Sequence, residues 1–148
     1  MTDLRLDRTF AVTPDALFGW VTEPGRLARW WGPEGMTLGD CDLDLTRLGP
    51  YHFTLIDPSG GAHRAHGQVR AVNPPRSVTF SLYVPNPIGN PIDSVVRFEV
   101  HADAAGSRLV LIQSGLTSEQ MADASSKGWV STLGRLAALL TSLTPNDT

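Results

Sequence analysis

The chain has 148 residues, a length that suits one domain and allows a substantial hydrophobic core. Hydrophobic residues make up 41% and charged residues 18%, a balance that is typical of globular proteins and argues against disorder. The net charge of −3, without a basic cluster, argues against nucleic acid or an anionic membrane surface as a partner. Nothing resembles a signal peptide, a membrane span or a disulfide framework, so we expect a cytoplasmic protein.

The first part of the chain predicts one strand followed by two short helices. Residues 4–12 mix apolar and charged positions, which indicates the strand. The threonine and proline at 13–14 form a helix start, because threonine is a favoured N-cap and proline lacks the amide that would be unpaired in the first turn. This predicts a helix over 15–21. The same signal returns at 22–24 and predicts a second helix over about 25–30.

The middle of the chain has the period of two that is typical of strands. Acidic and apolar residues alternate through 40–45, which predicts a half-buried strand with Cys41 on its inner face and aspartates on its outer face. Further strands, separated by turn sequences, are predicted over 51–56, 63–72, 77–84, 93–102 and 107–114. The prolines of residues 85–91 predict a loop that interrupts this series.

The last part of the chain predicts one long helix. Thr117 is a candidate N-cap, and Gln120 follows at the spacing of a capping box. Apolar residues then recur at steps of four and three and form a single stripe. They are Trp129, Leu133, Leu136, Leu140 and Leu143. A helix with one apolar stripe has to lie across the concave side of a sheet, so the fold class is α+β with an antiparallel sheet. Such an arrangement often leaves an apolar gap, where a small ligand can bind.

Several segments match a known family. The tryptophan-tryptophan-glycine-proline of residues 30–33 is the most specific, and segments 8–18, 67–80 and 128–140 are also similar. On these residues the sequence resembles the activator of heat-shock protein 90 ATPase-like branch of the START-like superfamily, which includes Bet v 1-like proteins and polyketide cyclases. The resemblance covers nearly the whole chain. It implies a helix-grip fold, in which a curved sheet holds the last helix, and one START-like domain over residues 1–148.

The sequence departs from the family pattern in two places. Leu48 stands where the family usually has one of two paired glycines, and Pro50 follows, so the turn before the next strand is expected to differ. The proline-rich segment 85–91 is also particular to this chain and is placed to shape the mouth of a pocket.

The candidate site lies where the sheet faces the last helix. Strand parity turns one face of residues 51–56, 77–84 and 93–102 toward that helix. Adjacent residues at a helix end point about 100° apart, so we expect only one of Trp30 and Trp31 to enter the core and the other to face the cavity or its rim. A histidine, His52 or His66, is a candidate polar group in the cavity. The candidate ligand-binding residues are Trp30, Trp31, Tyr51, Phe53, His66, Phe80, Leu82, Phe98, Trp129, Leu133 and Leu136.

Other residues that could carry chemistry favour ordinary roles. Asp40, Asp42 and Asp44 fit a solvated strand face better than an acid–base or cation site. Cys41 fits a small buried hydrophobe better than a nucleophile. Arg47 and Arg97 fit the surface better than a ligand anchor. His63 and His66 are three apart in a strand and face opposite sides. We therefore expect no metal and no cofactor.

Three functions remain open at this point. The first is binding of a small, mostly apolar, aromatic or lipid-like molecule, in a carrier, sensor or stress-related role. The second is an enzyme of the cyclase, aromatase or hydrolase type, with His52, His66 and Asp93 as weak candidates for its acid or base. The third is a cochaperone-like module with a chaperone partner, which needs an exposed apolar patch at 85–92 or 31–33. A homodimer through either surface is compatible with all three.

Overall fold

The computed structural model describes residues 2–85 and 91–143 of the protein. Within these ranges seven strands form one antiparallel sheet, in the order β1-β7-β6-β5-β4-β3-β2. The strands are β1 (Thr2–Phe10), β2 (Thr37–Leu38), β3 (Gly49–Ile56), β4 (Ala62–Asn73), β5 (Ser77–Val84), β6 (Ile92–Asp103) and β7 (Gly106–Leu116). The helices are α1 (Pro14–Trp20), α2 (Pro24–Leu27) and α3 (Glu119–Ser142).

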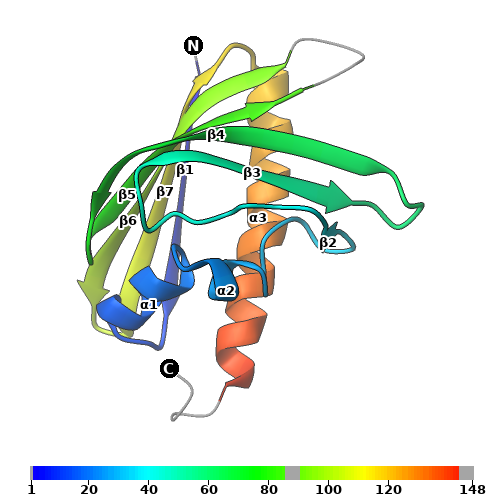
Figure 1. Ribbon diagram of the computed structural model, residues 1–148. Helices are drawn as coiled ribbons and strands as arrows, with labels where there is room; N and C mark the ends of the chain where they lie inside the picture. The colour runs from blue at the N-terminus through cyan, green and yellow to red at the C-terminus, as the bar shows by residue number, and fades with distance from the viewer. Residues whose placement is uncertain (1, 86–90, 144–148) are drawn as a thin grey trace.

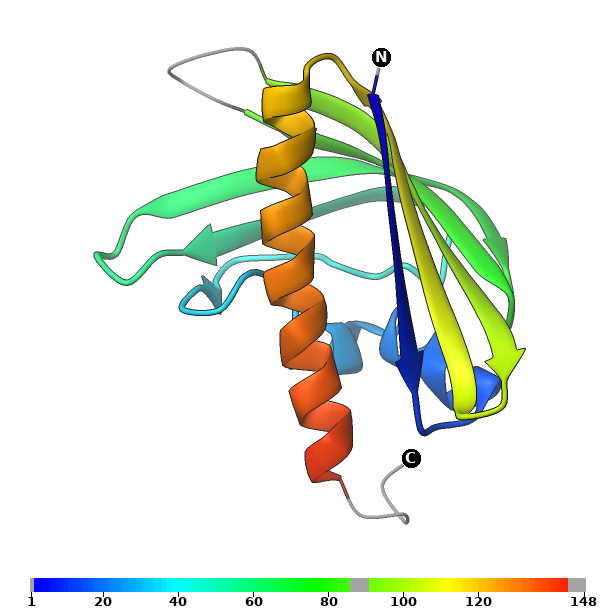
Figure 2. The same cartoon turned by 180° about the vertical axis from the view of Figure 1, so that it is seen from behind.

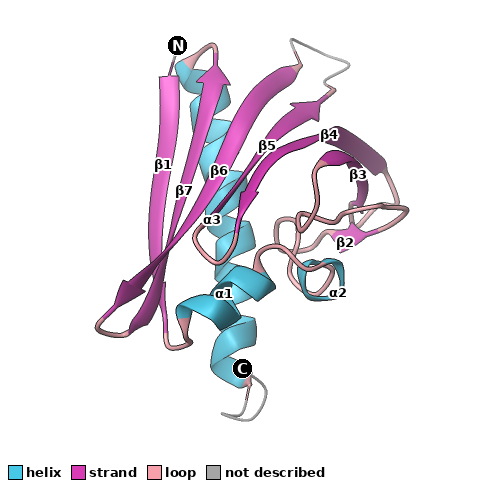
Figure 3. Ribbon diagram, turned by 60° about the vertical axis from the view of Figure 1, so that its left-hand side comes forward, coloured by secondary structure: helices cyan, strands magenta, loops and turns pink. Residues whose placement is uncertain are grey.

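The sheet curls around α3, which crosses its concave side (Figure 1 and Figure 2). The two short helices lie at one end of the sheet, beside the C-terminal half of α3 (Figure 3). This arrangement confirms the predicted α+β fold with a curved antiparallel sheet, two short helices after the first strand and one long final helix. The residues 86–90 of the predicted proline-rich loop lie outside the described part of the chain.

The starts of the short helices follow the sequence signals only in part. Thr13 caps α1 as predicted, because its side chain accepts a hydrogen bond from the Ala16 amide at 3.2 Å. The second helix is shorter than predicted and ends at Leu27. Its N-cap residue, Glu23, makes no side-chain cap bond, and the Thr22 hydroxyl instead donates back to a carbonyl of α1 at 2.6 Å.

The long helix begins one residue later than predicted. Ser118, not Thr117, is the N-cap, and its Oγ accepts from the Met121 amide at 3.1 Å. Because Met121 then occupies the third helical position, Gln120 cannot complete a capping box, and that prediction is wrong. The apolar stripe is confirmed, since Trp129 and the leucines of the stripe up to Leu140 are buried against the sheet.

The strand predicted over 40–45 is wrong for most of its length. The short strand β2 ends before it, and one isolated bridge joins Asp42 to His52. The chain leaves the sheet edge because the Leu45 amide donates to the Thr22 carbonyl at 3.0 Å, beside the short helices, instead of to a neighbouring strand. The sheet pattern therefore stops although the alternation of side chains continues.

The side chains of this segment show the same partial agreement. Its two leucines are buried as predicted. Cys41 is exposed, so its predicted inward position is wrong, because this stretch runs outside the sheet that would have fixed its orientation. The aspartates face solvent or lie at the surface, where Arg47 approaches Asp42 and Asp44 at 3.4 and 3.5 Å.

The core is organised by aromatic side chains on the concave face. Tyr51, Phe80, Phe98 and Trp129 form a series of edge-to-face contacts from β3 to α3, with ring centroids 5.7, 5.3 and 5.9 Å apart. Each such pair adds about 0.5–1.5 kcal/mol beyond the burial of its area. The inward orientation predicted from strand parity is confirmed for these residues. The series fixes the sheet's curvature around α3 and positions the wall described next.

Candidate functional site

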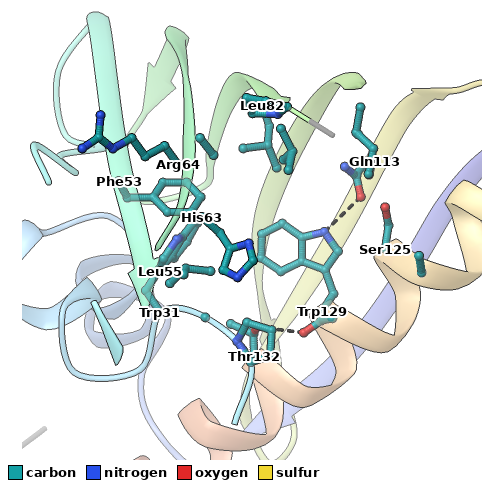
Figure 4. Close-up of a pocket in the computed structure, with 18 of the residues that line it drawn as sticks. Trp31, Phe53, Leu55, His63, Arg64, Leu82, Gln113, Ser125, Trp129 and Thr132 are labelled. Atoms are coloured by element: carbon teal, nitrogen blue, oxygen red, sulfur yellow. Dashed lines mark hydrogen bonds between the residues drawn. The ribbon is translucent and has the colours of Figure 1, made fainter. Parts of the chain in front are cut away.

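A pocket of about 790 Å³ lies between the concave side of the sheet and the first half of α3. Its walls come from β3 to β7, from the turn at 31–33 and from α3 (Figure 4). Large apolar side chains make up much of its lining, among them Trp31, Phe53, Leu55, Leu82, Ile92 and Trp129. Exposed residues at its edge, such as Arg64 and Ala124, show that it opens to solvent.

Three aromatic rings form the most rigid wall of the pocket. Trp31 meets Phe53 and Trp129 edge-on, with centroid distances of 5.5 and 5.7 Å. Trp129 is also held by Phe98 at 5.9 Å. These rings are buried in contacts with one another and with the core, so this wall is preformed and does not depend on a ligand to assemble it.

The turn that carries Trp31 is tied to α3. Arg135 Nη1 lies within hydrogen-bonding distance of four carbonyl oxygens of this turn, the nearest being that of Gly32 at 2.9 Å. The Ser131 hydroxyl accepts from the Glu34 amide, also at 2.9 Å. Gly32 has a φ of 99°, a conformation that side-chain-bearing residues rarely adopt. The pocket wall is therefore positioned by the helix on its other side.

One buried polar residue, Gln113, faces the same pocket. It is only 1% exposed. Trp129 Nε1 donates to Gln113 Oε1 at 3.0 Å (Figure 4). Gln113 Nε2 donates to Ser94 Oγ at 2.9 Å. The Ser94 hydroxyl in turn donates to the Leu82 carbonyl at 3.2 Å. This chain of hydrogen bonds connects α3, β7, β6 and β5 along the inner wall.

A histidine lies at the edge of the pocket, on the hairpin that joins β3 and β4. His63 lines the pocket (Figure 4). Its Nε2 is 2.8 Å from Asp57 Oδ2. Asp57 Oδ1 accepts from the amides of Ser59 and Gly61 at 3.0 and 2.8 Å. The hydrogen bond with His63, followed by those from Ser59 and Gly61, lowers the pKa of Asp57 below its usual range. An ionised carboxylate thus orients the imidazole.

The structure brings part of the predicted site together. Trp31, Phe53, Leu82 and Trp129 line the pocket. The other predicted apolar residues are buried in the core around it and are not part of its lining. They are Trp30, Tyr51, Phe80, Phe98, Leu133 and Leu136.

The orientation expected for His66 is wrong. The buried positions of β4 are the odd-numbered ones within 65–69, so His66 lies on the convex face, where its ring stacks near Tyr83 at 5.1 Å. His52 pairs directly with it in the sheet and shares that face. The prediction that His63 and His66 point to opposite sides is correct, but the inner one is His63.

The expectation for the two adjacent tryptophans is confirmed in part, because Trp31 faces the pocket as expected, but it is wrong that only one of them is buried in the core. Trp30 and Trp31 are both buried, with ring centroids 5.6 Å apart. They follow the end of α2 at Leu27 and point to different places, Trp30 toward Trp20 and Trp31 toward Phe53 and Trp129, and both places are buried. Trp30 Nε1 donates to the Trp20 carbonyl at 2.9 Å, while Trp31 faces the pocket.

Sequence reasoning missed several residues of the pocket lining, among them Gln113, His63, Leu55, Ile92 and Gly128. A signal for Gln113 was present, because it occupies the inward position that follows Leu109 and Leu111 along β7, where a polar side chain breaks the pattern. The remaining weak candidates lie away from the pocket. Asp93 is exposed, and Arg97 pairs with Glu99 at 2.7 Å on the surface.

Among residues 2–85 and 91–143 no group of three or more histidine, cysteine, aspartate or glutamate side chains is arranged to hold a metal ion. In the same ranges no helix has the length and apolar character needed to cross a membrane.

A curved antiparallel sheet that holds one long C-terminal helix, with a pocket between them, defines the helix-grip class of α+β proteins. Residues 11–141 match the family model described as Activator of Hsp90 ATPase homolog 1-like protein, and the chain belongs to this family. The resemblance inferred from the sequence is thereby confirmed. No curated protein matches the chain.

Solved structures show the same fold. The AHSA1 protein of Silicibacter pomeroyi is 40% identical, with a TM-score of 0.88 over 95% of this chain and 98% of that one. A protein of Chromobacterium violaceum is 23% identical, with a TM-score of 0.82 over 93% of this chain and 96% of that one. DynU16, from the dynemicin biosynthetic locus, is 20% identical, with a TM-score of 0.73; the match covers 95% of this chain and 47% of DynU16.

Proposed function

We propose that this protein binds a small, mostly apolar molecule in the pocket between the sheet and α3. The observation that carries the proposal is the preformed wall of Trp31, Phe53 and Trp129 in an open pocket of about 790 Å³. A ligand that buries about 250 Å² of apolar surface there gains about 6 kcal/mol before the entropy of association is subtracted. The proposed ligand is aromatic or lipid-like, and the role is that of a carrier or sensor.

The small residues of α3 allow a direct test. A Cβ added to Gly128, which lines the pocket, meets nothing within 4 Å, and the same holds for Gly134 on the same helix, which is not in the lining. A side chain at 128 therefore begins in open space, so Gly128→Leu is expected to occupy part of the pocket, and Gly134→Leu is the matched control. Both variants and the natural chain would be purified from an expression host and from the protein's own host.

Native mass spectrometry then detects any bound compound, and denaturation followed by small-molecule analysis identifies it. The proposal expects a stoichiometric compound on the natural chain and on Gly134→Leu, and its loss from Gly128→Leu. A bare natural chain whose tryptophan fluorescence is also unmoved by a panel of aromatic and fatty compounds would overturn the proposal. If Gly128→Leu binds the compound as well as the natural chain does, the binding site lies elsewhere in the protein.

A second candidate function is catalysis on the same ligand. The observation that favours it is the 2.8 Å contact between His63 and Asp57 at the pocket edge, because an oriented imidazole is a common general base. Incubating the identified compound with the natural chain and with His63→Ala tests it. A compound that the natural chain converts and His63→Ala only binds supports an enzyme, and a compound unchanged by both argues against one.

The cochaperone-like alternative has less support. It requires an exposed apolar patch at 31–33 or at 85–92. Trp31 of the first segment is buried, and residues 86–90 of the second lie outside the described part of the chain. Among the described residues the large hydrophobic side chains that are exposed are Leu48 and Val130, which lie before β3 and on α3. Two separate side chains on different segments do not make a continuous patch.

A further inference from the structure

We propose that the pocket selects ligands that carry a carbonyl-type oxygen, and that the side-chain amide of Gln113 is the group that recognises it. The ligand class is an apolar, ring-bearing ketone, quinone or similar carbonyl compound. This inference rests on the proposed function, because it assigns the ligand chemistry of the same pocket. Among the described residues, two polar side chains of the lining are buried, Gln113 and Thr132, and the Thr132 hydroxyl already donates to the Gly128 carbonyl, so the candidate group is the amide of Gln113.

The orientation of the Gln113 amide is fixed by its neighbour. An indole N–H can only donate, so the atom of Gln113 that lies 3.0 Å from Trp129 Nε1 has to be the carbonyl oxygen. The amide nitrogen is then directed to Ser94 Oγ at 2.9 Å. The Ser94 hydroxyl accepts this hydrogen and passes its own to the Leu82 carbonyl at 3.2 Å. The donor and the acceptor of each hydrogen bond in this series are therefore determined by the indole N–H.

This arrangement leaves one donor unused. A glutamine amide has two N–H hydrogens, and within the described part of the chain Gln113 Nε2 has one protein acceptor, Ser94 Oγ. The residue is 1% exposed and lines the pocket. A buried donor without an acceptor is costly, and a purely apolar ligand that covers it would also exclude the water that can otherwise satisfy it.

The surroundings of Gln113 favour a ligand that offers a neutral oxygen as the acceptor for the free N–H of its amide. The groups that hydrogen-bond with the Gln113 amide are the indole of Trp129 and the hydroxyl of Ser94, and neither carries charge. Of the lining residues, Arg64 and His63, which pairs with Asp57 outside the lining, lie on the β3–β4 hairpin at the pocket edge. A carboxylate buried against Gln113 would lack a counter-charge, whereas a carbonyl oxygen needs only the one donor.

The test compares 9-fluorenone with fluorene. The two have nearly the same shape, and the ketone is the more polar, so non-specific partition into an apolar pocket favours fluorene. We expect the natural chain to bind fluorenone about tenfold more tightly by equilibrium dialysis, the ratio that one buried hydrogen bond provides. In Gln113→Met the ratio should fall to about one. Thr132→Val is the matched control, because the Thr132 hydroxyl already donates to the Gly128 carbonyl at 2.8 Å; it should keep the preference.

A second readout does not depend on a folded Gln113 variant. In a ¹H–¹⁵N spectrum of the natural chain, fluorenone should move one of the two Gln113 side-chain amide protons downfield, and fluorene should not. Equal binding of the two compounds would overturn this inference while the proposed function stands. A preference for fluorenone that persists in Gln113→Met would assign recognition to another donor and overturn it as well. Binding of neither compound would count against both.

Discussion

The two halves of α3 meet the same sheet in different ways. In the C-terminal half the inward residues are leucines, and Leu133 and Leu136 are fully buried in the core. In the N-terminal half the corresponding residues include Ala124, Ser125 and Gly128, and the pocket lies there. The helix and the curvature of the sheet are common to both halves, so the size of the side chains on α3 decides where the interface is filled and where it stays open.

The largest expected change in stability comes from making a cavity under the C-terminal half of α3, where the interface with the sheet is filled. Leu136→Ala should lower the free energy of unfolding by about 2–5 kcal/mol, because it removes a fully buried side chain and leaves a cavity. Ser125→Ala in the open half should change it by less than about 0.5 kcal/mol. Urea denaturation of both variants measures the difference. Equal losses would mean that the open half contributes to stability as much as the filled half.

A smaller loss of stability is expected when the contacts of Arg135 with the turn at 31–36 are removed, because these contacts hold one wall of the pocket in place. Arg135→Met should lower the free energy of unfolding by about 1–3 kcal/mol, since it leaves carbonyls of the turn at 31–36 without their donor. Hydrogen exchange should increase at the Glu34 amide, whose N–H donates a hydrogen bond to the Ser131 hydroxyl. Arg135→Lys, which keeps one donor group, should restore part of the loss. An unchanged exchange rate would show that the turn holds its position without the arginine.

Filling the open half should stabilise the protein slightly. Gly128→Leu and Gly134→Leu each replace a helical glycine, so each should raise the free energy of unfolding by about 0.5–1 kcal/mol. Thermal unfolding measures this change. An additional gain for Gly128→Leu over its control would come from apolar contacts made in the pocket. A loss of stability in Gly128→Leu alone would show that the pocket cannot accept a protein side chain.

The smallest effect concerns the hairpin at the pocket edge. The pKa of Asp57 is lower in the folded protein than in the unfolded chain, chiefly through His63. The stability that Asp57 contributes is therefore fully present above its unfolded pKa of about 4 and is lost as the pH falls below that value. Asp57→Asn should make the urea midpoint less sensitive to pH between about 5 and 3. An unchanged pH dependence would show that this exposed pair adds nothing measurable.

Periodicity predicted the sheet where large inward residues alternate with polar outward ones. Strand β5 over Ser77–Val84 agrees with its prediction at both ends, and Phe80 and Leu82 face inward as expected. The prediction failed at 40–45, where alternation continues after the chain has left the sheet. Its departure depends on the hydrogen bond from Leu45 to Thr22, a contact between distant segments that no local pattern records.

The site was less predictable than the fold for a related reason. Strand parity identified Phe53 and Leu82 as inward residues, and both line the pocket. It cannot say how far along α3 the interface stays open, because that depends on small residues such as Gly128 meeting the ends of several strands. Whether His63 or His66 faces the pocket depends on whether the odd- or the even-numbered residues of β4 point inward. Ala65 and Gly67 do point inward, but their side chains are too small to reveal this in the sequence.

The contacts of Arg135 have a consequence for the order of folding. They join residues 99 to 104 positions apart in the sequence. Contacts of such separation form late, because a long loop has to close before they add any stability. We therefore expect Trp31 to be held in its native place only when α3 has docked on the sheet. A compound that fits the pocket would then bind only the chain with α3 docked, and would shift the folding equilibrium toward that state.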